Sequence, residues 1–479
     1  MNRELKRVSI AVLLMFVTLL CSSTIITVFQ TDSLRVDSRN VRTIYDSYSA
    51  ERGPILVQGR PIAESKPSKD KFNFQRVYSN PELYSPVTGY FTLNQGNTGI
   101  EGSLNDYLSG TDNNQFLDKM NAIITGKNPQ GAAVATTIDP VLQQAASDAL
   151  GTNTGAVIAI NPKTGVILAM VSKPGYDPNL LAAHDTDTVI ANYKKLLADP
   201  TDPLINRTIS GKLYHPGSVF KLVVASAALN SGKYTPDSEF PNPSSLKLPG
   251  SSTSINNAEG GSCGGTPTVS IANALRLSCN IPFAQLGAAL GADEISKYAT
   301  AFGFGQKLSV PMYVTPSTYP KNTDAAKLML SSFGQDEDRV TPLQIAMVSA
   351  AIANGGVLMK PTLIGNITEP NLTIVQAYQQ EVLGQPISAQ TSATLTQLMV
   401  ANVNNGAASN ARINGVDVAG KTGTAQNGEG QKYTLWFTGF APAVDPQIAI
   451  AVVVENGTGF GNQVAAPIAR KVIEAVLNK

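Results

Sequence analysis

Charge, histidine and cysteine are all scarce in this chain of 479 residues. Only 15% of the residues are charged, against a usual ~25%, and the formal net charge is +1. A nucleic-acid partner is therefore not expected, because phosphate binding needs a concentrated positive surface. The two histidines (His184 and His215) and the three cysteines (Cys21, Cys263 and Cys279) do not have the spacing of a zinc site. We expect neither a metal nor a cofactor.

An uncharged stretch near the N-terminus predicts a membrane anchor. As a helix, Val8–Phe29 would span about 33 Å, enough for a bilayer core of ~30 Å. Arg3, Lys6 and Arg7 precede it, which predicts a cytoplasmic N-terminus and an extracytoplasmic remainder. A cleaved signal peptide is the alternative, but its apolar core usually ends after about 7–15 residues. We therefore expect a single-pass protein of the cell membrane.

Turn-rich segments divide the chain into three predicted parts. These are the cytoplasmic tip and anchor (1–30), a small non-catalytic module (31–130) and the main domain (131–479). In the module we expect mostly β-structure and loops, with one helix near Asn114–Thr125. No fixed-period repeat and no low-complexity tract is found in the sequence.

The main domain is predicted to be α+β. A helix opens it, with Asp139 as its cap and Pro140 at its first position. Strands are expected at both ends of the domain and apolar helices in the middle, so the chain's end should complete the sheet. The expected strands are 155–160, 166–172, 435–440 and 447–454, and the expected helices are 220–229, 270–277, 342–353 and one from Ala466.

Three Ser-x-x-Lys pairs occur, and their surroundings separate them. Ser68 lies in a solvated charge run, and Ser244 lies between turn-forming prolines. Ser218 instead follows a His-Pro-Gly turn and opens an apolar helix, so Ser218 and Lys221 lie one turn apart on the same face. A nucleophilic hydroxyl needs a base within hydrogen-bond reach, and this spacing supplies one. We predict that Ser218 is a nucleophile and Lys221 its base; a helix cap followed by a surface lysine is the alternative.

A Ser-x-Asn motif follows at Ser278-Cys279-Asn280. It comes after an apolar helix and before a proline, which places it on a short loop between helices. There Ser278 can relay a proton, and Asn280 can hold a substrate amide while orienting Lys221. An ordinary polar turn is the alternative interpretation of such a motif alone.

Lys-Thr-Gly occurs twice. Lys163 lies in a five-residue hairpin turn, which explains that copy without chemistry. Lys421 lies among small residues, which let a strand edge approach another backbone closely. Lys421 adds a cation and Thr422 a hydroxyl, both suited to a substrate carboxylate. A turn is again the alternative for the motif alone.

The order of the three motifs, with intervals of 60 and 143 residues, resembles the penicillin-binding proteins and serine β-lactamases. Further segments, from about residue 50 to the end, resemble class B penicillin-binding proteins, most of all the PbpA-type actinobacterial subgroup. They include Arg52-Gly53-Pro54-Ile55, Thr98-Gly99-Ile100-Glu101, Thr137-Ile138-Asp139, Thr341-Pro342-Leu343-Gln344 and Trp436-Phe437-Thr438-Gly439. One departure is Val57-Gln58, where Asp-Arg commonly stands, and it concerns the N-terminal module.

The resemblance implies a transpeptidase fold, with an antiparallel sheet flanked by helices, and D,D-transpeptidation of peptidoglycan. Ser218 would attack the penultimate D-alanine of a stem peptide ending in D-Ala-D-Ala, and β-lactams would acylate the same hydroxyl. The amides of Ser218 and Thr424 would form the oxyanion hole. A SEDS-type glycan polymerase is an implied partner, and roles in cell division and cell shape both stay open. The implied substrate-binding residues are Lys421, Thr422, Gly423 and Thr424.

Related activities are less consistent with the sequence. A class A β-lactamase carries a deacylating Glu between the second and third motifs, followed four residues later by Asn. None of the glutamates in that interval has such an Asn; they are Glu294, Glu337, Glu369 and Glu381. Residues 31–130 are too few for a glycosyltransferase domain. A D,D-carboxypeptidase and a non-catalytic β-lactam sensor or wall scaffold stay as alternatives, and turnover of a peptide or thioester donor would separate them.

Cys263 and Cys279 are the cysteines beyond the anchor, and the predicted topology puts them in an oxidising compartment. They lie sixteen residues apart across a Gly-rich segment, so we predict a disulfide between them, with two free thiols as the alternative. In the chain-entropy view, a loop of this length contributes about 3 kcal/mol of stability. The bond would pin the loop that carries Ser278 and Asn280.

Overall fold

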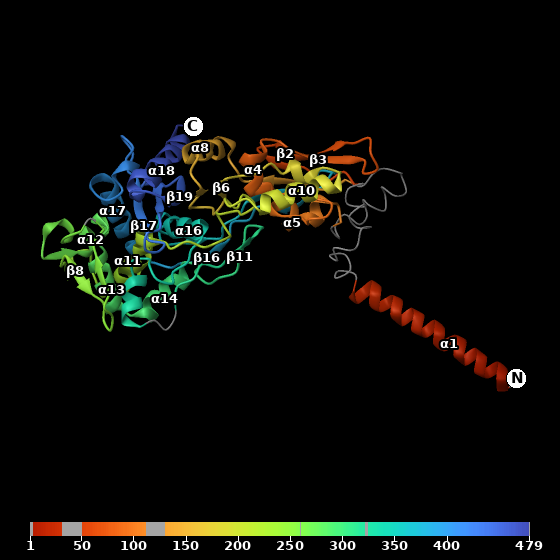
Figure 1. Cartoon of the computed structure of the whole chain (residues 1–479), viewed down its shortest axis with the longest axis horizontal. Helices are drawn as coiled ribbons and strands as arrows, with labels where there is room; N and C mark the ends of the chain where they lie inside the picture. Colours follow the sequence, from red (N-terminus) through yellow and green to blue (C-terminus); the bar gives the residue numbers. More distant parts are fainter. Residues whose placement is uncertain (1–2, 31–49, 112–129, 259, 321–323, 479) are drawn as a thin grey trace.

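The computed structural model describes residues 3–30, 50–111, 130–258, 260–320 and 324–478. Helix α1 (Arg3–Thr24) continues as a π-helical turn (Ile25–Phe29) and stands apart from the folded body (Figure 1). Its span Leu5–Thr27 has a mean hydropathy of 2.4 and is long and apolar enough to cross a membrane. The helix expected over Val8–Phe29 is therefore present, and its apolar side chains are exposed, as contact with lipid requires.

The N-terminal module is built on a six-stranded sheet with the order β15-β14-β4-β1-β2-β3. β1 and β4 run parallel, whereas the other neighbouring pairs are antiparallel. Two strands, β14 and β15, come from far down the chain and close one side of the sheet. The strands are β1 (Ile55–Val57), β2 (Arg60–Pro67), β3 (Phe74–Tyr78), β4 (Ala133–Thr136), β14 (Ile364–Thr368) and β15 (Ile374–Ala377).

Among the described residues of the module lie three short helices, where the sequence analysis expected mostly β-structure and loops. They are α4 (Pro81–Thr88), α5 (Gly99–Ser103) and α6 (Asn105–Leu108). α4 begins with proline at its first position after Asn80, a start signal that the sequence analysis did not use. α5 and α6 are too short for apolar periodicity to reveal them. The helix expected near Asn114–Thr125 lies outside the described residues.

A buried ion network lies inside this module. Glu101 Oε2 accepts from Arg52 Nε at 2.5 Å, and Glu101 Oε1 accepts from Arg76 Nε at 2.7 Å. Tyr78 Oη donates to the same Oε1 at 3.2 Å. Burial pushes the pKa of Glu101 upward, but attraction by Arg76 and Arg52 outweighs it and leaves that pKa below its usual value. The carboxylate is therefore charged and compensated.

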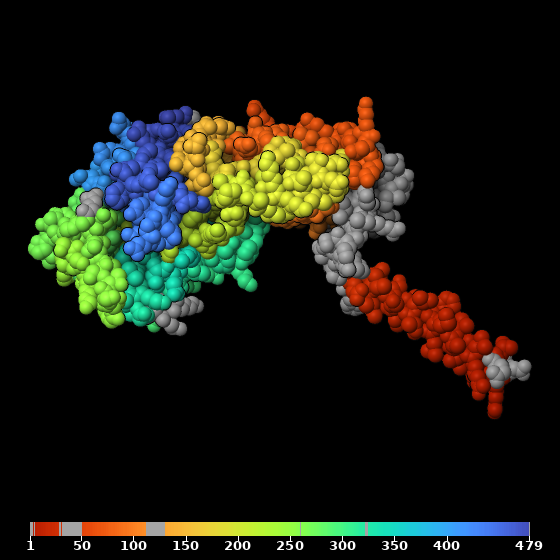
Figure 2. Space-filling model, in the orientation of Figure 1, coloured from red at the N-terminus to blue at the C-terminus, as the bar shows by residue number. Residues whose placement is uncertain are grey.

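A segment of the main domain that carries α9 (Asn179–Ala182) and α10 (Thr186–Leu197) packs against the module. It is yellow in Figure 2 and covers part of the orange surface of the module. Tyr193 on α10 meets Tyr90 edge-on, with ring centroids 6.1 Å apart. One hydrophobic cluster also runs from Ile55 and Ile100 in the module to Leu343 in the main domain, so the two parts share a core.

The main domain is built on a five-stranded antiparallel sheet with the order β17-β18-β19-β5-β6. The strands from the chain's end complete it, as expected, and β17 is an edge strand. The strands are β5 (Gly155–Ile160), β6 (Ile167–Lys173), β17 (Ala419–Ala425), β18 (Tyr433–Ala441) and β19 (Ile448–Gly457). Residues alternate between two cores: Ile158 packs with α16 on one face, and Val157 packs with α8 and α18 on the other.

The predicted helices of this domain are present. Asp139 caps α8 (Pro140–Leu150) by accepting from Val141 N and Leu142 N. α18 (Gly461–Leu477) begins five residues before the predicted Ala466, and Pro467 lies inside the helix. The remaining helices are α11 (Lys221–Asn230), α12 (Ile271–Leu277), α13 (Asn280–Leu290), α14 (Ala292–Ala301), α15 (Ala325–Ser331), α16 (Pro342–Ala353) and α17 (Ala389–Asn405). Of these, α11, α12 and α16 lie close to their predicted bounds, whereas α13, α14, α15 and α17, like α9 and α10, were not predicted.

Further pairs of short strands lie in this domain outside the main sheet. β7 (Glu239–Pro241) pairs with β10 (Thr268–Ser270), and β8 (Ser245–Lys247) pairs with β9 (Ser254–Asn256). These two pairs hold the Gly-rich segment with Cys263 beside α12 and α13. The other pairs are β11 (Leu308–Ser309) with β12 (Tyr313–Val314), and β13 (Leu358–Met359) with β16 (Val382–Gly384).

Candidate active site

Ser218 lies on a tight turn that leads directly into α11. Residues Gly217–Phe220 form a 3₁₀ turn, and Lys221 is the first residue of the α-helix. Gly217 N donates to Gly334 O at 2.9 Å, which fixes the start of the turn. Ser218 and Lys221 therefore have the one-turn spacing that the sequence predicted, and Ser218 lines a cavity of about 810 Å³.

Lys221 is fully buried and hydrogen-bonds to the Ser-x-Asn loop. Its Nζ donates to Ser278 O at 2.7 Å and to Asn280 Oδ1 at 2.8 Å. Burial, and then the nearby charge of Lys421, hold the pKa of Lys221 well below its usual value. Among the described residues, no acidic side chain forms an ion pair with it. Neutral amine is therefore the form that this environment favours.

Ser278 and Cys279 form a two-residue link between α12 and α13, as the Ser-x-Asn motif predicted. Ser278 has φ 62° and ψ 36°, a left-handed conformation that is uncommon for serine. Such backbone strain persists only where surrounding contacts enforce it, and it is concentrated at functional sites. The left-handed turn directs Ser278 O to Lys221, while Ser278 Oγ accepts from Lys421 Nζ at 2.7 Å.

Lys421 lies on β17, the sheet edge that faces the Ser218 turn. Its Nζ also donates to Thr422 O at 2.9 Å, and the side chain is fully buried. Burial lowers the pKa of Lys421 to about 7. Both the amine and the ammonium forms are therefore populated near neutral pH.

The three residues that follow Lys421 on β17 lie close to the backbone of neighbouring segments. A Cβ on Gly423 would lie 2.9 Å from Pro216 O, so glycine lets β17 approach the Ser218 turn. Thr422 Oγ1 donates to Ala407 O at 2.9 Å, and Thr424 Oγ1 accepts from Gly461 N at 3.1 Å. The two hydroxyls thus hold neighbouring backbone, and all three residues line the same cavity as Ser218.

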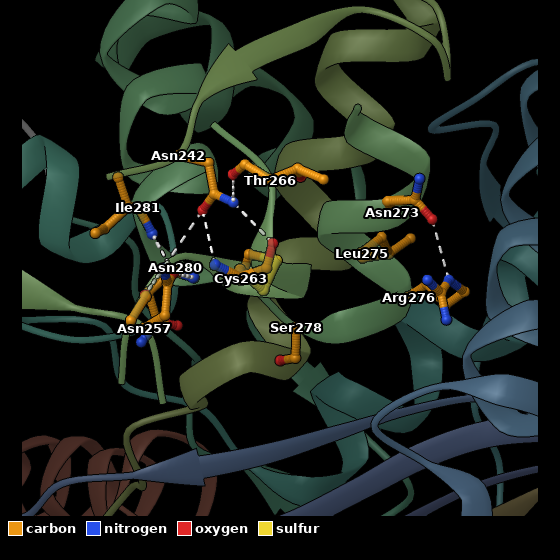
Figure 3. The surroundings of a disulfide bond; sticks show 12 residues. Asn242, Asn257, Cys263, Thr266, Asn273, Leu275, Arg276, Ser278, Asn280 and Ile281 are labelled. Carbon is orange, nitrogen blue, oxygen red and sulfur yellow. Dashed lines mark hydrogen bonds between the residues drawn. A yellow bond between two sulfur atoms is a disulfide. The ribbon is translucent and has the colours of Figure 1, made fainter. Parts of the chain in front are cut away.

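Cys263 and Cys279 are joined by a disulfide, with their Cα atoms 5.8 Å apart (Figure 3). The bond ties the Gly-rich segment to the middle residue of the Ser-x-Asn motif. Cys279 is buried, whereas Cys21 on α1 is exposed and unpaired. The structure thus holds the pair that the sequence analysis favoured over two free thiols.

His215 and the rejected motif copies lie outside this chemistry. Arg339 Nη1 donates to His215 Nδ1 at 2.9 Å, and burial followed by the charge of Arg339 lowers the pKa of His215 to about 4. His215 is therefore uncharged at neutral pH and supports the turn before Ser218. Ser244 is exposed. Lys163 is exposed in the hairpin turn between β5 and β6, and it forms an ion pair with Asp445.

Two buried asparagines next to the motif were missed by the sequence analysis. Asn257 Oδ1 accepts from Asn280 N at 2.9 Å, and Asn242 contacts the backbone around Cys263. Their partners lie about 20 residues away along the chain. A loop asparagine carries no local sequence signal for such contacts, so only the assembled structure identifies them.

Comparisons with known proteins agree with this geometry. Residues 155–474 match the family described as penicillin binding protein transpeptidase domain. Residues 52–134 match the family described as penicillin binding protein A dimerisation domain. The first match contains all five strands of the main sheet, and the second contains β1 to β3 of the N-terminal sheet.

Relatives and solved structures match over the whole body. The chain is 41% identical to the peptidoglycan D,D-transpeptidase PbpA of Mycolicibacterium smegmatis, over 100% of both chains. It is also 41% identical to PbpA of Mycobacterium tuberculosis, over 100% of this chain and 99% of the relative. The ceftriaxone acyl-enzyme complex of penicillin-binding protein A from M. tuberculosis superposes with a TM-score of 0.87 at 40% identity, covering 90% of this chain and 100% of that one. This chain therefore belongs to the class B penicillin-binding proteins, as a member of their actinobacterial PbpA type.

Proposed function

We propose that this protein is a peptidoglycan D,D-transpeptidase that cross-links stem peptides through an acyl-enzyme at Ser218. The observation that carries the proposal is the pair of buried lysines around Ser278. Lys221 Nζ is 2.7 Å from Ser278 O, and Lys421 Nζ is 2.7 Å from Ser278 Oγ. All of these groups lie beside the cavity that Ser218 lines.

The hydrogen bonds of Lys221 suit a general base. A neutral amine has two N–H groups and one lone pair, and Ser278 O and Asn280 Oδ1 use both N–H groups. The lone pair is left to take the proton of Ser218 as its Oγ attacks the penultimate D-alanine carbonyl. By family analogy, the amides of Ser218 and Thr424 stabilise the resulting oxyanion.

Expulsion of the terminal D-alanine requires a proton on its nitrogen. Ser278 Oγ accepts from Lys421, so its hydroxyl proton can pass to the leaving amine while the ammonium form of Lys421 replaces it. An amine of a neighbouring stem peptide then takes the acyl group from Ser218 and gives up its proton through Ser278 to Lys421. Lys221 returns its proton to Ser218 Oγ, which closes the cross-link and restores the enzyme. Asn280, held on Lys221, is placed to bind the amide of the donor peptide.

Lys421 is suited to the terminal carboxylate of the donor. Its pKa of about 7 leaves it partly neutral in the unliganded site. An arriving carboxylate would raise that pKa, because an opposite charge favours the ammonium form. A bound substrate or β-lactam carboxylate would thus increase the positive charge of Lys421, the group that binds it. Thr422, Gly423 and Thr424 complete this wall of the cavity.

The topology follows from α1 and the charges before it. Arg3, Lys6 and Arg7 favour a cytoplasmic N-terminus, with one membrane span and an extracytoplasmic main domain. The Cys263–Cys279 disulfide fits an oxidising compartment. On this topology the parts are the tip and anchor (1–30), the non-catalytic module (31–130) and the transpeptidase domain (131–479). A SEDS-type glycan polymerase, which would supply glycan strands at the same membrane, is the proposed partner.

Turnover of a donor tests the function. The full-length chain in detergent is incubated with a thioester peptide donor and a D-amino acid acceptor, and the products are separated chromatographically. We expect acyl transfer to the acceptor, loss of transfer in Ser218→Ala, and full transfer in the matched variant Ser244→Ala. Penicillin labelling without any turnover would instead indicate a sensor, and hydrolysis without transfer would indicate a carboxypeptidase.

A further inference from the structure

Asn257 lies in the wall of the active-site cavity, and its side chain joins that wall to the helix that begins with Asn280. We propose that Asn257 is a positioning residue for the reaction: it caps α13 from outside the helix and thereby sets Asn280 against Lys221. The inference rests on the proposed function, because it assigns a role in acylation.

The start of α13 lacks a cap of its own. The residue before it is Cys279, whose sulfur is in the disulfide and forms no cap hydrogen bond. Asn257 Oδ1 instead accepts from Asn280 N at 2.9 Å and from Ile281 N at 3.2 Å. It thus satisfies the first two amides of the helix, including that of Ile281, which a Ser, Thr, Asp or Asn cap would otherwise serve.

The rest of the amide fixes the orientation of Asn257. Its Nδ2 donates to Gly261 O at 3.1 Å and reaches Asn242 Oδ1 at 3.5 Å. Asn242 Nδ2 donates to Cys263 O at 2.7 Å and to Thr266 O at 2.8 Å, and its Oδ1 accepts from Cys263 N at 3.1 Å. Figure 3 shows both amides between the Gly-rich segment and α13. Both side chains are buried, 5% and 1% exposed, so water does not replace these bonds.

The arrangement gives the Ser-x-Asn motif two attachments to the same segment. One is the covalent bond from Cys263 to Cys279, and the other is the hydrogen-bonded path from Asn242 through Asn257 to Asn280. The second path also reaches the proposed base, because Asn280 Oδ1 accepts from Lys221 Nζ at 2.8 Å. A shift of Asn280 N would therefore move an acceptor of the proposed base.

A purely structural role for Asn257 would be to satisfy loop backbone. The two roles differ in what they do to Lys221, whose pKa is lowered by burial first and by Lys421 second. Lys421, on β17, is the charged group that faces it among the described residues, and the Phe283 and Phe333 rings border it without charge. If Asn280 moves away, water reaches Lys221, desolvation falls and its pKa rises. Acylation needs the neutral amine, so its rising limb would move to higher pH.

The experiment measures the second-order rate of acylation by a fluorescent penicillin against pH, using the full-length chain in detergent. Asn257→Ala is expected to lower the rate about 10- to 100-fold, because small misplacements of catalytic groups have effects of this size. Its rising pH limb is expected to move upward. Asn257→Asp keeps an acceptor at the helix start and is expected to recover most of the rate. Ser254→Ala, on the exposed neighbouring strand β9, is the control and should match the wild type in rate and pH limb.

The final labelled fraction reports how much protein is folded and active, which separates rate from folding. A wild-type rate and pH limb in Asn257→Ala would overturn the inference, as would a lower labelled fraction with an unchanged rate. If Asn257→Ala does not fold, Asn257→Gln decides: its longer side chain displaces the cap, and a wild-type rate in that variant would equally overturn it. Failure of the wild type itself to label would instead refute the proposed function.

Discussion

Two pairs of buried cations lie in the part of the chain that the structure describes, and they differ in what surrounds them. In the N-terminal module, Arg52 and Arg76 share the carboxylate of Glu101. In the active site, Lys221 and Lys421 contact neutral oxygens of the Ser-x-Asn loop and of β17. All of these side chains are at most 3% exposed, so burial alone does not distinguish the pairs.

The two pairs differ in whether a buried anion balances their positive charge. Arginine stays charged at any ordinary pH, so a buried arginine pair needs an anion, and Glu101 provides one. Lysine can lose its proton, so a buried pair without an anion responds by lowered pKa values. Compensation makes the first pair a structural element of the module. Lack of compensation suits the second pair to the proton transfers of the proposed function.

Lys221→Met should separate chemistry from stability most sharply. Removing the base is expected to lower the acylation rate by about 10²–10⁴-fold. Stability should change by less than about 2 kcal/mol, because two lost hydrogen bonds are partly offset by the loss of a buried amine. Stopped-flow acylation and thermal unfolding measure the two quantities. Near-normal acylation would show that another group takes the proton of Ser218.

Glu101→Gln should show the reverse pattern. It leaves Arg52 and Arg76 buried without an anion, which is expected to lower the free energy of unfolding by about 3–5 kcal/mol. Acylation per folded molecule should stay normal, since Glu101 lies in the other part of the chain. Denaturant unfolding with parallel penicillin labelling checks both. Glu64→Gln, which breaks the partly exposed ion pair with Lys66, is a control for which nearly unchanged stability is expected.

Lys421→Ala should discriminate between ligands. Loss of a charge-assisted bond to a carboxylate is expected to slow acylation by a carboxylate-bearing β-lactam roughly 10–100-fold more than by its matched ester. The ratio of the two rate losses is the measurement. An equal loss for both ligands would assign Lys421 to the pKa of Lys221 rather than to the substrate carboxylate.

Stability should depend on pH through Lys421 in neutral to alkaline solution and through Glu101 in acidic solution. The folded pKa of Lys421 is about 7, below its unfolded value, so the unfolded state binds more protons and stability rises as pH increases above about 7. The folded pKa of Glu101 is also lowered, so its contribution is lost as pH falls below the usual carboxyl range. Melting temperatures from pH 3 to 10 test this. Lys421→Met should reduce the alkaline rise, of which Lys221 supplies the remainder, and should leave the acid side unchanged; an undiminished rise would refute the assignment.

Local signals were sufficient to predict much of the fold. Asp139 with Pro140 marked the start of α8, and the turn around Lys163 marked the β5–β6 hairpin. Motif context also separated Ser218 from Ser68 and Ser244, because only Ser218 precedes an apolar helix. These features depend on residues close together in the chain.

Features that depend on distant residues were not predicted. α18 was expected from Ala466 but begins at Gly461, whose amide donates to Thr424 Oγ1 on β17. The capping of α13 by Asn257 depends on a chain reversal with no periodic pattern. The addition of β14 and β15 to the N-terminal sheet likewise needs the assembled fold.

That last feature has a consequence for the order in which the protein is made. In the proposed topology the N-terminal tip stays in the cytoplasm and the chain beyond α1 crosses the membrane in sequence order, so β1 to β4 reach the outer surface long before β14. Until β14 arrives, β4 presents an open strand edge, which is a template for wrong pairing. The N-terminal module thus completes its sheet only after much of the transpeptidase region has crossed the membrane. Its maturation is therefore timed by the secretion of the catalytic part, and a truncation before Ile364 would leave the module without its partner strand.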